Sequence, residues 1–366
     1  MLQSKKNRYA ERLENLQSHL KEQRCDTLVI QDEINLYYLT GLSLSAGSLL
    51  VHPKGAELLV DGRYEQACKE SSPFPVHPIE SGALATLIEK IGPFKTLGFN
   101  SNNFTYSNFL TLEKEIAPLT GLTLLPLEGP VEKLRTIKDE EEISLLKEAS
   151  ALGSEGFDYL LTLLREGISE IELAIELEIF WKRKGSKALA FDPIIAFGTN
   201  SAMPHYRASG AILQKNQAVL LDIGVCYKHY HSDMTRVVYF GQPDPKMLAI
   251  HKVVLEAQEK ALQLCRPGVR AAELDAAARD HITDNGFGQY FTHSLGHGIG
   301  LEIHEQPFLR NKPPAAERFL QEGMVVTIEP GIYLPGVGGV RIEDSVLLTP
   351  QGHENLTNRA KEAQII

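Results

Sequence analysis

Four carboxylates stand inside apolar segments of the kind that form buried strands. Asp222 closes the run AVLLD, and Asp233 lies in the following segment HSDMTRVV. Glu329 interrupts MVVTIEPG, and Glu343 lies in GVRIEDSVLL. A buried carboxylate without a partner is costly, so such residues are usually paired with a positive group or bound to a metal ion. We therefore interpret these four residues as candidates for one charged site.

The spacing of the carboxylates predicts two hairpins. The midpoint of the first pair falls at Tyr227–Lys228, and the midpoint of the second pair falls at Gly336. If each hairpin turns at its midpoint, its two carboxylates lie opposite each other, with Cβ atoms ~4.5–5.5 Å apart. Two like charges at that distance need a cation between them.

Histidines supply further ligand candidates. The segment FTHSLGHGIGLEIHEQP carries His293, His297 and His304, and His205 lies in NSAMPHYRAS. Four carboxylates with one or two imidazoles form a hard, oxygen-rich donor set, which favours Mn²⁺ and is also compatible with Co²⁺, Fe²⁺ or Zn²⁺. Four negative charges balance two divalent cations, and a pair of such ions is a known arrangement for activating water.

Two pairs of helices precede the predicted hairpins and must position them. Helical periodicity covers, in chain order, Lys138–Leu164, Ile171–Lys184, Lys246–Cys265 and Ala271–Asn285. The segments that start at Arg165 and Arg266 align without gaps, so that Gly167 falls on Gly268. A helix pair followed by a hairpin, occurring twice, predicts one two-fold pseudo-symmetric domain over residues 136–366.

The residues before this domain have a different pattern. A helical segment is expected over Arg8–Arg24, and strands and a further helix are expected at Thr27–Ile30, Ser48–His52, Glu57–Asp61 and Ala83–Ile91. This alternation predicts a small α/β domain over residues 1–128. Pro126, Gly129 and Pro130 mark the boundary that follows it.

Length and composition narrow the class of protein. A chain of 366 residues is long enough for about two domains. Its 37 Lys and Arg against 47 Asp and Glu give a net charge of −10, which lacks the electrostatic footprint of a protein that binds nucleic acid or anionic membranes. No apolar run approaches the ~18–20 residues that cross a bilayer.

The cysteines and the first residues predict the cellular compartment. The four cysteines are isolated, with no CxxC pair, and are expected to be reduced thiols. The charged segment MLQSKKNRYAERLENLQSHLKEQR lacks the apolar core of a secretory signal. We therefore expect a cytoplasmic protein.

Five sequence blocks together resemble the metallopeptidases with the pita-bread fold, in the branch of Xaa-Pro aminopeptidases and prolidases. The blocks are VEKLRTIKDEEEISLLKEA, LLDIGVCYKHYHSDMTR, HSLGHGIGLEIHEQP, TIEPGIY and GVRIED. They run through the whole C-terminal domain, whereas the amino-terminal domain offers the weaker match DGRYEQA. The resemblance implies a pseudo-two-fold α+β domain in which a curved antiparallel sheet is covered by helices.

The resemblance also implies a ligand set for two divalent ions. Carried over by motif position, the metal ligands are Asp222, Asp233, His297, Glu329 and Glu343. Asp233 and Glu343 would contact both ions, and the ions would activate the attacking water. Glu329 would in addition pass a proton to the departing amine as a general acid–base group.

Four further residues receive roles from the same resemblance. His205, His293 and His304 match the histidines that face the substrate, and they would stabilise the oxyanion and hold the residues beside the cleaved bond. Arg341 stands two residues before Glu343 and is a candidate to orient that carboxylate. An ordinary surface arginine on a strand is the alternative interpretation of Arg341.

We therefore expect a dinuclear metal exopeptidase that removes the N-terminal residue ahead of proline, an Xaa-Pro aminopeptidase. One alternative is a strict Xaa-Pro dipeptidase, or prolidase, and another is a non-catalytic binding module that retains the fold. The expected partners are small peptides with proline at the second position, and neither nucleic acid nor a membrane. Members of the family that act before proline are commonly homodimers, which is the expectation for this chain.

Overall fold

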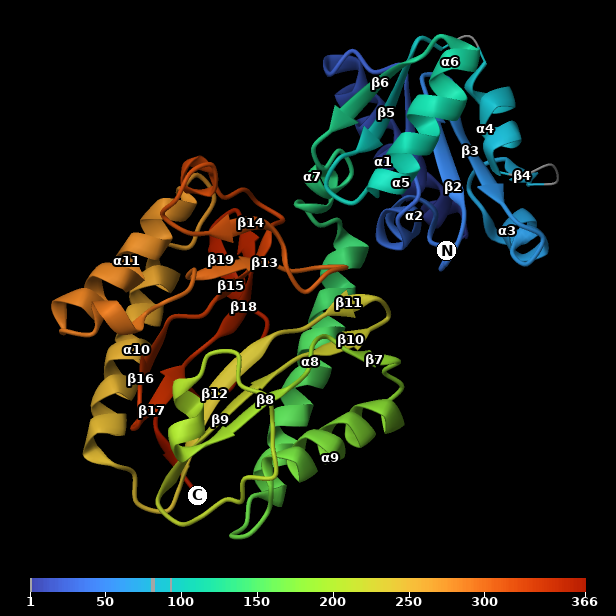
Figure 1. Ribbon diagram of the computed structural model, residues 1–366. Coiled ribbons are helices and arrows are strands. Elements are labelled where there is room, and N and C mark those ends of the chain that lie inside the picture. Colours follow the sequence, from blue (N-terminus) through green and yellow to red (C-terminus); the bar gives the residue numbers. More distant parts are fainter. Residues whose placement is uncertain (1, 80–82, 93) are drawn as a thin grey trace. The chain divides into compact units, whose positions relative to one another are not determined.

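The computed structural model describes residues 2–79, 83–92 and 94–366. The chain divides into two compact units, Met1–Arg135 and Thr136–Ile366 (Figure 1). No helix of the described ranges is both long enough and apolar enough to span a membrane.

The first unit is built on a six-stranded sheet in the order β4-β3-β2-β1-β5-β6. Its strands are β1 (Thr27–Ile30), β2 (Ser48–His52), β3 (Gly55–Val60), β4 (Val76–Pro78), β5 (Thr96–Asn100) and β6 (Thr123–Leu127). Its helices are α1 (Leu2–Glu22), α2 (Glu33–Thr40), α3 (Glu65–Ser71), α4 (Ala83–Ile91), α5 (Tyr106–Thr111), the π-helix η1 (Leu112–Ile116), α6 (Ala117–Thr120) and α7 (Glu132–Arg135). Strands β1, β5 and β6 run parallel to one another, whereas β2 is antiparallel to both of its neighbours. The expected α/β pattern is therefore present, with differences of a few residues at the ends of α1 and β3.

Four long helices frame the second unit. They are α8 (Glu140–Leu163), α9 (Glu170–Arg183), α10 (Pro245–Leu264) and α11 (Ala271–Asp284). The first two begin with capping boxes, in which Asp139 exchanges hydrogen bonds with Glu142 and Ser169 exchanges them with Glu172. The helix pairs agree with the sequence-based ranges to within two residues, because caps and periodicity are local signals.

The strands of the second unit form several short sheets. A four-stranded sheet has the order β20-β12-β9-β8, and a five-stranded sheet has the order β14-β13-β15-β18-β19. The strands of these sheets are β8 (Ile194–Phe197), β9 (Gln217–Ile223), β12 (Met234–Phe240), β13 (Gly296–Gly298), β14 (Glu305–Leu309), β15 (Val325–Ile328), β18 (Asp344–Thr349), β19 (Gly352–Asn355) and β20 (Gln364–Ile365). The smaller sheets and 3₁₀ turns contain β7 (Ala188–Leu189), β10 (Val225–Tyr227), β11 (Tyr230–His231), β16 (Gly331–Leu334), β17 (Gly338–Arg341), η2 (Gly198–Ala202), η3 (Gly288–Tyr290) and η4 (Ala315–Glu317).

The two halves of this unit repeat the same backbone contacts. Gly167 donates its amide to the carbonyl of Leu213, and Gly268 donates to that of Leu320. Both glycines have positive φ angles, 86° and 85°. The predicted two-fold repeat is therefore present in the backbone, and the pseudo-symmetric α+β fold class expected from the sequence is correct.

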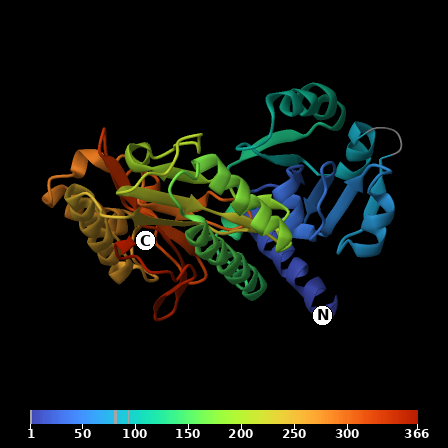
Figure 2. The ribbon, with the colours of Figure 1, turned by 90° about the horizontal axis from the view of Figure 1, so that it is seen from below.

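The strands lie between the two helix pairs, as Figure 2 shows from below. Along β9, Val219 and Leu221 belong to a core shared with α8 and α9, whereas Leu220 belongs to a core shared with α10 and α11. Alternation along a strand then places Asp222 on the same face as Leu220. The apolar core on this face of β9 ends at Leu220, and the carboxylate of Asp222 lines a cavity.

The two hairpins turn at different places relative to the expectation. The second turns at Gly336, as predicted, because Leu334 pairs with Gly338. The first turns one residue later than expected, at Lys228 and His229, which both have positive φ angles as a two-residue hairpin turn requires.

This turn corrects the predicted register of the first hairpin. Asp222 pairs with Thr235 and not with Asp233. The turn type fixes register, and the midpoint of two functional residues carries no information about it.

Candidate active site

All the residues singled out in the sequence line one cavity of about 640 Å³ in the second unit. They are His205, Asp222, Asp233, His293, His297, His304, Glu329, Arg341 and Glu343. The chain brings them from five separate segments to one place. A cavity of this size lies in the range of small-molecule sites.

Three of these residues form a compact group of ligand atoms. Asp233, His297 and Glu343 each offer one atom, and these atoms lie within 4.8 Å of one another. All three residues are buried, with Glu343 only 1% exposed. Asp233 and Glu343 immediately precede β12 and β18, and His297 is the middle residue of β13, so three strands converge on the group.

Arg341 is placed differently from the sequence-based expectation. It is 3% exposed, and its guanidinium donates to a carboxylate oxygen of Asp222. Its Nε donates to Thr235 Oγ1 at 3.2 Å, and Thr235 in turn donates to Glu343 at 2.7 Å. The surface interpretation is therefore wrong, and Arg341 reaches Glu343 through Thr235 and not directly.

One oxygen on each of two carboxylates has no partner among the described residues. These atoms are Asp222 Oδ1 and Glu343 Oε1, both buried. Buried polar atoms are normally satisfied, so an exception in a polar cavity indicates a group that binds there. A divalent cation with oxygen ligands fits both atoms.

Burial and crowding raise the pKa of three carboxyl groups. The pKa of Asp233 lies well above its usual value because of burial, and next because of the charges of Glu343, Asp222 and Glu329. Burial, followed by the charges of Glu329 and Asp222, likewise holds the pKa of Glu343 well above its usual value. Burial also raises the pKa of Asp222, against the opposing charge of Arg341. Cations bound in the cavity would lower these pKa values again, since positive charge favours the ionised carboxylates.

Glu329 differs from its three neighbours. Burial acts to raise its pKa, but the hydrogen bond and positive charge of His297 outweigh burial and lower the pKa to about 2. Its Oε1 lies 3.3 Å from His297 Nε2 and accepts a hydrogen bond from Thr327 Oγ1. Glu329 is therefore the carboxylate of the group that is held ionised.

The orientation of His297 suits a metal ligand. Its Nδ1 lies 3.0 Å from the carbonyl oxygen of Gly298, and a carbonyl only accepts, so Nδ1 carries the hydrogen. In the neutral ring, the lone pair of Nε2 then faces the carboxylates of Asp233 and Glu329, at 3.6 and 3.3 Å. Nε2 must bind either a proton or a cation there, because a lone pair beside two anions is unfavourable.

His293 has both ring nitrogens engaged. Nδ1 lies 2.8 Å from the carbonyl oxygen of Ser294, and Nε2 lies 2.9 Å from Tyr333 Oη. Tyr333 Oη also accepts a hydrogen bond from Arg341 at 2.6 Å. Burial lowers the pKa of His293, so its neutral form is favoured, with Nε2 accepting from the tyrosine.

His304 packs against the metal-ligand group. Its ring meets that of His297 edge to face, with centroids 4.4 Å apart. Burial lowers the pKa of His304, and the neighbouring charges of His297 and His205 add to this effect. A neutral His304 can donate or accept a hydrogen bond in the cavity.

Sequence reasoning did not single out Tyr333 and Thr235. Thr235 lies two residues after Asp233, and Tyr333 lies four residues after Glu329 in TIEPGIY. The period of two along a strand places Thr235 on the face of Asp233, which is a signal that could have found it.

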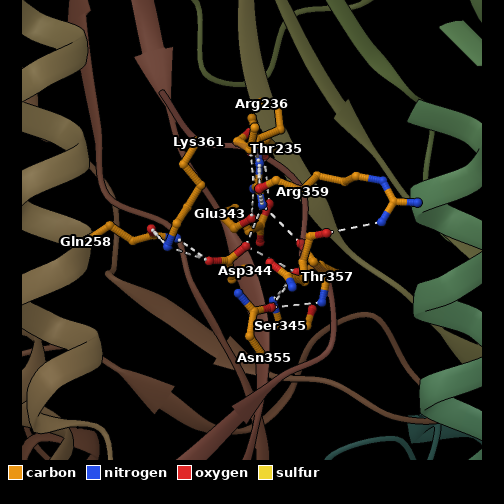
Figure 3. A network of polar contacts seen from close by, with 12 residues as sticks. Thr235, Arg236, Gln258, Glu343, Asp344, Ser345, Asn355, Thr357, Arg359 and Lys361 are labelled. Carbon is orange, nitrogen blue, oxygen red and sulfur yellow. Dashed lines mark hydrogen bonds and ion pairs between the residues drawn. The ribbon is translucent and has the colours of Figure 1, made fainter. Parts of the chain in front are cut away.

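A polar network surrounds the buried side chain of Asp344, next to the cavity residue Glu343 (Figure 3). Arg236 Nη1 donates to the carbonyl oxygen of Glu343 at 2.5 Å, and its Nη2 donates to Asp344 Oδ1 at 2.6 Å. Lys361 and Gln258 donate to the other oxygen of Asp344. Asp344 begins β18 and its carboxylate belongs to this network, whereas the carboxylate of Glu343, one residue earlier, belongs to the cavity lining.

Comparisons with known proteins place these features in context. Residues 144–350 match metallopeptidase family M24, and residues 12–137 match the Creatinase/Prolidase N-terminal domain. An Xaa-Pro dipeptidase of Pyrococcus furiosus is 38% identical over 356 residues, which span 96% of this chain and 99% of that protein.

Solved structures show the same likeness. An Xaa-Pro dipeptidase from Bacillus anthracis has a TM-score of 0.93 and 37% identity, covering 98% of this chain and 100% of that chain. An X-Pro aminopeptidase from Thermotoga maritima has a TM-score of 0.86 and 33% identity, covering 94% of this chain and 98% of that chain.

Proposed function

The chain belongs to metallopeptidase family M24, and from this premise we propose that it is an Xaa-Pro dipeptidase. The observation that carries the proposal is the group Asp233, His297 and Glu343, buried in a cavity of small-molecule size. The relatives named as Xaa-Pro dipeptidases cover nearly the whole chain, which favours this alternative over the aminopeptidase expected from the sequence. The aminopeptidase stays the second candidate because of its likeness to the X-Pro aminopeptidase structure.

We assign the metal ligands to the four carboxylates and His297. Asp222, Asp233, His297, Glu329 and Glu343 would hold two divalent ions. The oxygen-rich set favours Mn²⁺, with Co²⁺, Fe²⁺ or Zn²⁺ as alternatives. When bound, such ions supply an activated water and polarise the scissile carbonyl. The unpartnered oxygens of Asp222 and Glu343 support this assignment.

Glu329 is the proposed proton carrier. Its carboxylate lies in the ligand group beside His297 and would accept a proton from the attacking water. The same oxygen atoms then return the proton to the proline nitrogen as the peptide bond breaks. Thr327, which donates to Glu329 Oε1, keeps this carboxylate oriented.

Three histidines are proposed to bind the substrate. His205 and His304 line the cavity and would donate hydrogen bonds to the peptide carbonyl or carboxylate. His293 would help to hold the residue beside the cleaved bond through its ring, since both of its nitrogens already have partners. Arg341 would fix Asp222, to which it donates.

We further propose that the protein works as a homodimer in a reducing compartment. The four cysteines are free thiols, which is typical of cytosolic proteins. Light scattering of the purified protein tests the dimer, and a monomer at assay concentration contradicts it.

The proposed activity is tested by measuring release of proline from Ala-Pro by protein reconstituted with Mn²⁺. Turnover that depends on the metal is expected. Little or no turnover of the tripeptide Ala-Pro-Ala under the same conditions supports the dipeptidase, and comparable turnover supports the aminopeptidase. No turnover of either peptide with any divalent metal contradicts both candidates.

A further inference from the structure

One carboxylate outside the cavity binds a whole loop. Glu170, the first residue of α9, is fully buried at 0% exposure. Its Oε1 accepts from the backbone amide of Phe197 at 2.8 Å and from Asn200 Nδ2 at 2.9 Å. Its Oε2 accepts from Tyr206 Oη at 2.7 Å, and from the backbone amide and Oγ of Ser209 at 3.1 and 2.9 Å. Five donors from residues 197–209 thus converge on one side chain.

These contacts require a carboxylate. Each oxygen of Glu170 receives one backbone amide, from Phe197 on one side and from Ser209 on the other. A backbone amide only donates, so both positions need an acceptor. A glutamine of the same shape has a single oxygen, and either orientation of its amide turns an NH₂ group toward one of these donors.

The internal repeat shows that α9 itself does not need this acid. The aligned position in the second half is Ala271, which is also fully buried and also begins a helix. The backbone amide of Glu170 donates to the carbonyl of Ala211, and that of Ala271 donates to the carbonyl of Arg318. The backbone arrangement is the same with and without a carboxylate, so the acid is not needed to begin the helix, and its five hydrogen-bond donors all belong to the loop of residues 197–209.

That loop forms part of the cavity wall. His205 and Tyr206 both line the cavity, and Tyr206 is the residue that donates to Glu170. At its start the loop is attached to β17, because Gly339 donates its amide to Ser201 Oγ at 2.8 Å. Glu170 attaches the loop on both sides of His205, through Phe197 and Asn200 before it and through Tyr206 and Ser209 after it.

We propose that Glu170 is a positioning residue that holds the loop of residues 197–209 so that His205 faces the substrate. The role of His205 toward the substrate rests on the proposed peptidase function, whereas the anchoring of the loop does not. Glu170 is not among the residues that line the cavity, so its loss is expected to weaken substrate binding more than the chemical step.

The anchoring itself can be measured without any activity assay. Hydrogen exchange of peptides that cover residues 198–209 is compared among the wild type, Glu170→Gln and the matched control Glu172→Gln. Glu172 lies two residues further on the same helix and caps it through Ser169, with no contact to the loop in its hydrogen bonds. Faster exchange in Glu170→Gln alone is expected, and equal protection in all three proteins overturns the proposal.

The consequence for the substrate is measured on Ala-Pro with the Mn²⁺-loaded protein. Loss of one charge-assisted hydrogen bond is expected to raise KM about tenfold, with kcat changed less than about threefold. Ser209→Ala, which keeps the backbone amide, is expected to raise KM in the same direction by about threefold and serves if Glu170→Gln does not fold.

A double-mutant cycle separates positioning from a general loss of structure. If Glu170 acts through His205, the effect of Glu170→Gln on KM shrinks in a His205→Ala background. If Glu170→Gln raises KM by the same factor with and without His205→Ala, the proposal is overturned. A wild type without activity would refute the proposed function instead, and the hydrogen-exchange result would still decide the anchoring.

Discussion

Removing the metal is expected to destabilise the second unit, and more so as the pH rises. In the metal-free protein, burial and neighbouring carboxylates hold the pKa of Asp233 and Glu343 well above the ordinary values of 3.8 and 4.5. The folded state therefore keeps protons that the unfolded state has lost. A carboxyl group with a raised pKa stabilises the fold at low pH and loses that contribution as the pH rises toward its folded-state pKa. Bound cations displace these protons, so the Mn²⁺-loaded protein escapes this loss.

The size of the effect follows from the number of protons displaced. Each proton changes the free energy of unfolding by about 1.4 kcal/mol per pH unit. The difference in the free energy of unfolding between the loaded and the metal-free protein therefore grows by that amount for each proton that the metal-free site keeps. Asp233 and Glu343 contribute, and so do Asp222 and His297, whose pKa values are also raised. Glu329, whose pKa is lowered to about 2, is ionised in both states above pH 6 and does not contribute.

The sequence provides its own probe for this measurement. Trp181 is the single tryptophan; it lies on α9 and is 1% exposed in the core that α8 and α9 share with the strands of the second unit. Urea unfolding followed by its fluorescence therefore reports on the second unit. Curves at pH 6, 7 and 8, with saturating Mn²⁺ or with a chelator, give the two free energies. If the free energy of unfolding with Mn²⁺ does not exceed that with a chelator by more at higher pH, the assignment of these carboxylates as crowded metal ligands is refuted.

Three further outcomes follow from buried charges. Asp344→Asn leaves the guanidinium of Arg236 without its buried anion and should lower the free energy of unfolding by about 3–5 kcal/mol, read from urea curves. Lys138→Met should cost a similar amount, about 3–5 kcal/mol, because it leaves Glu305 buried without the ammonium that lies 3.0 Å away, and a wild-type midpoint would show that the pair is unimportant. Asp233→Ala should lower turnover of Ala-Pro more than about a hundredfold while the far-ultraviolet circular dichroism is unchanged, and full activity would mean that the ligand set is wrong.

Local signals in the sequence predicted the elements of the fold well. The acidic cap at Asp139 and the glycines at the helix ends define the helices of the second unit, because capping depends on a few neighbouring residues. The hairpin at Gly336 was also predictable, since a glycine with a φ of 73° stands at the midpoint of the paired strands. The register of the first hairpin was not, because Lys228 and His229 do not show the usual Asn-Gly or Gly-Gly signature of such a turn.

The sequence allowed us to predict which residues line the cavity, but not which hydrogen bonds join them. Carboxylates in apolar segments can be recognised from the sequence, since charged residues are rare at positions that are expected to be buried. The pairing of Arg341 with Asp222 joins residues far apart in the sequence, so no local pattern encodes it. Glu170 lies in an ordinary capping segment, and its role becomes visible only where the chain folds back to place the 197–209 loop against it.

We propose above all that four carboxylates and His297 hold two divalent ions in one cavity. Equilibrium dialysis of the metal-free protein against Mn²⁺, with the metal counted per chain, tests it most directly. We predict about two ions per chain for the wild type and fewer for Asp233→Ala. Binding of no Mn²⁺ by the wild type, or of two ions by the folded variant, would contradict the account.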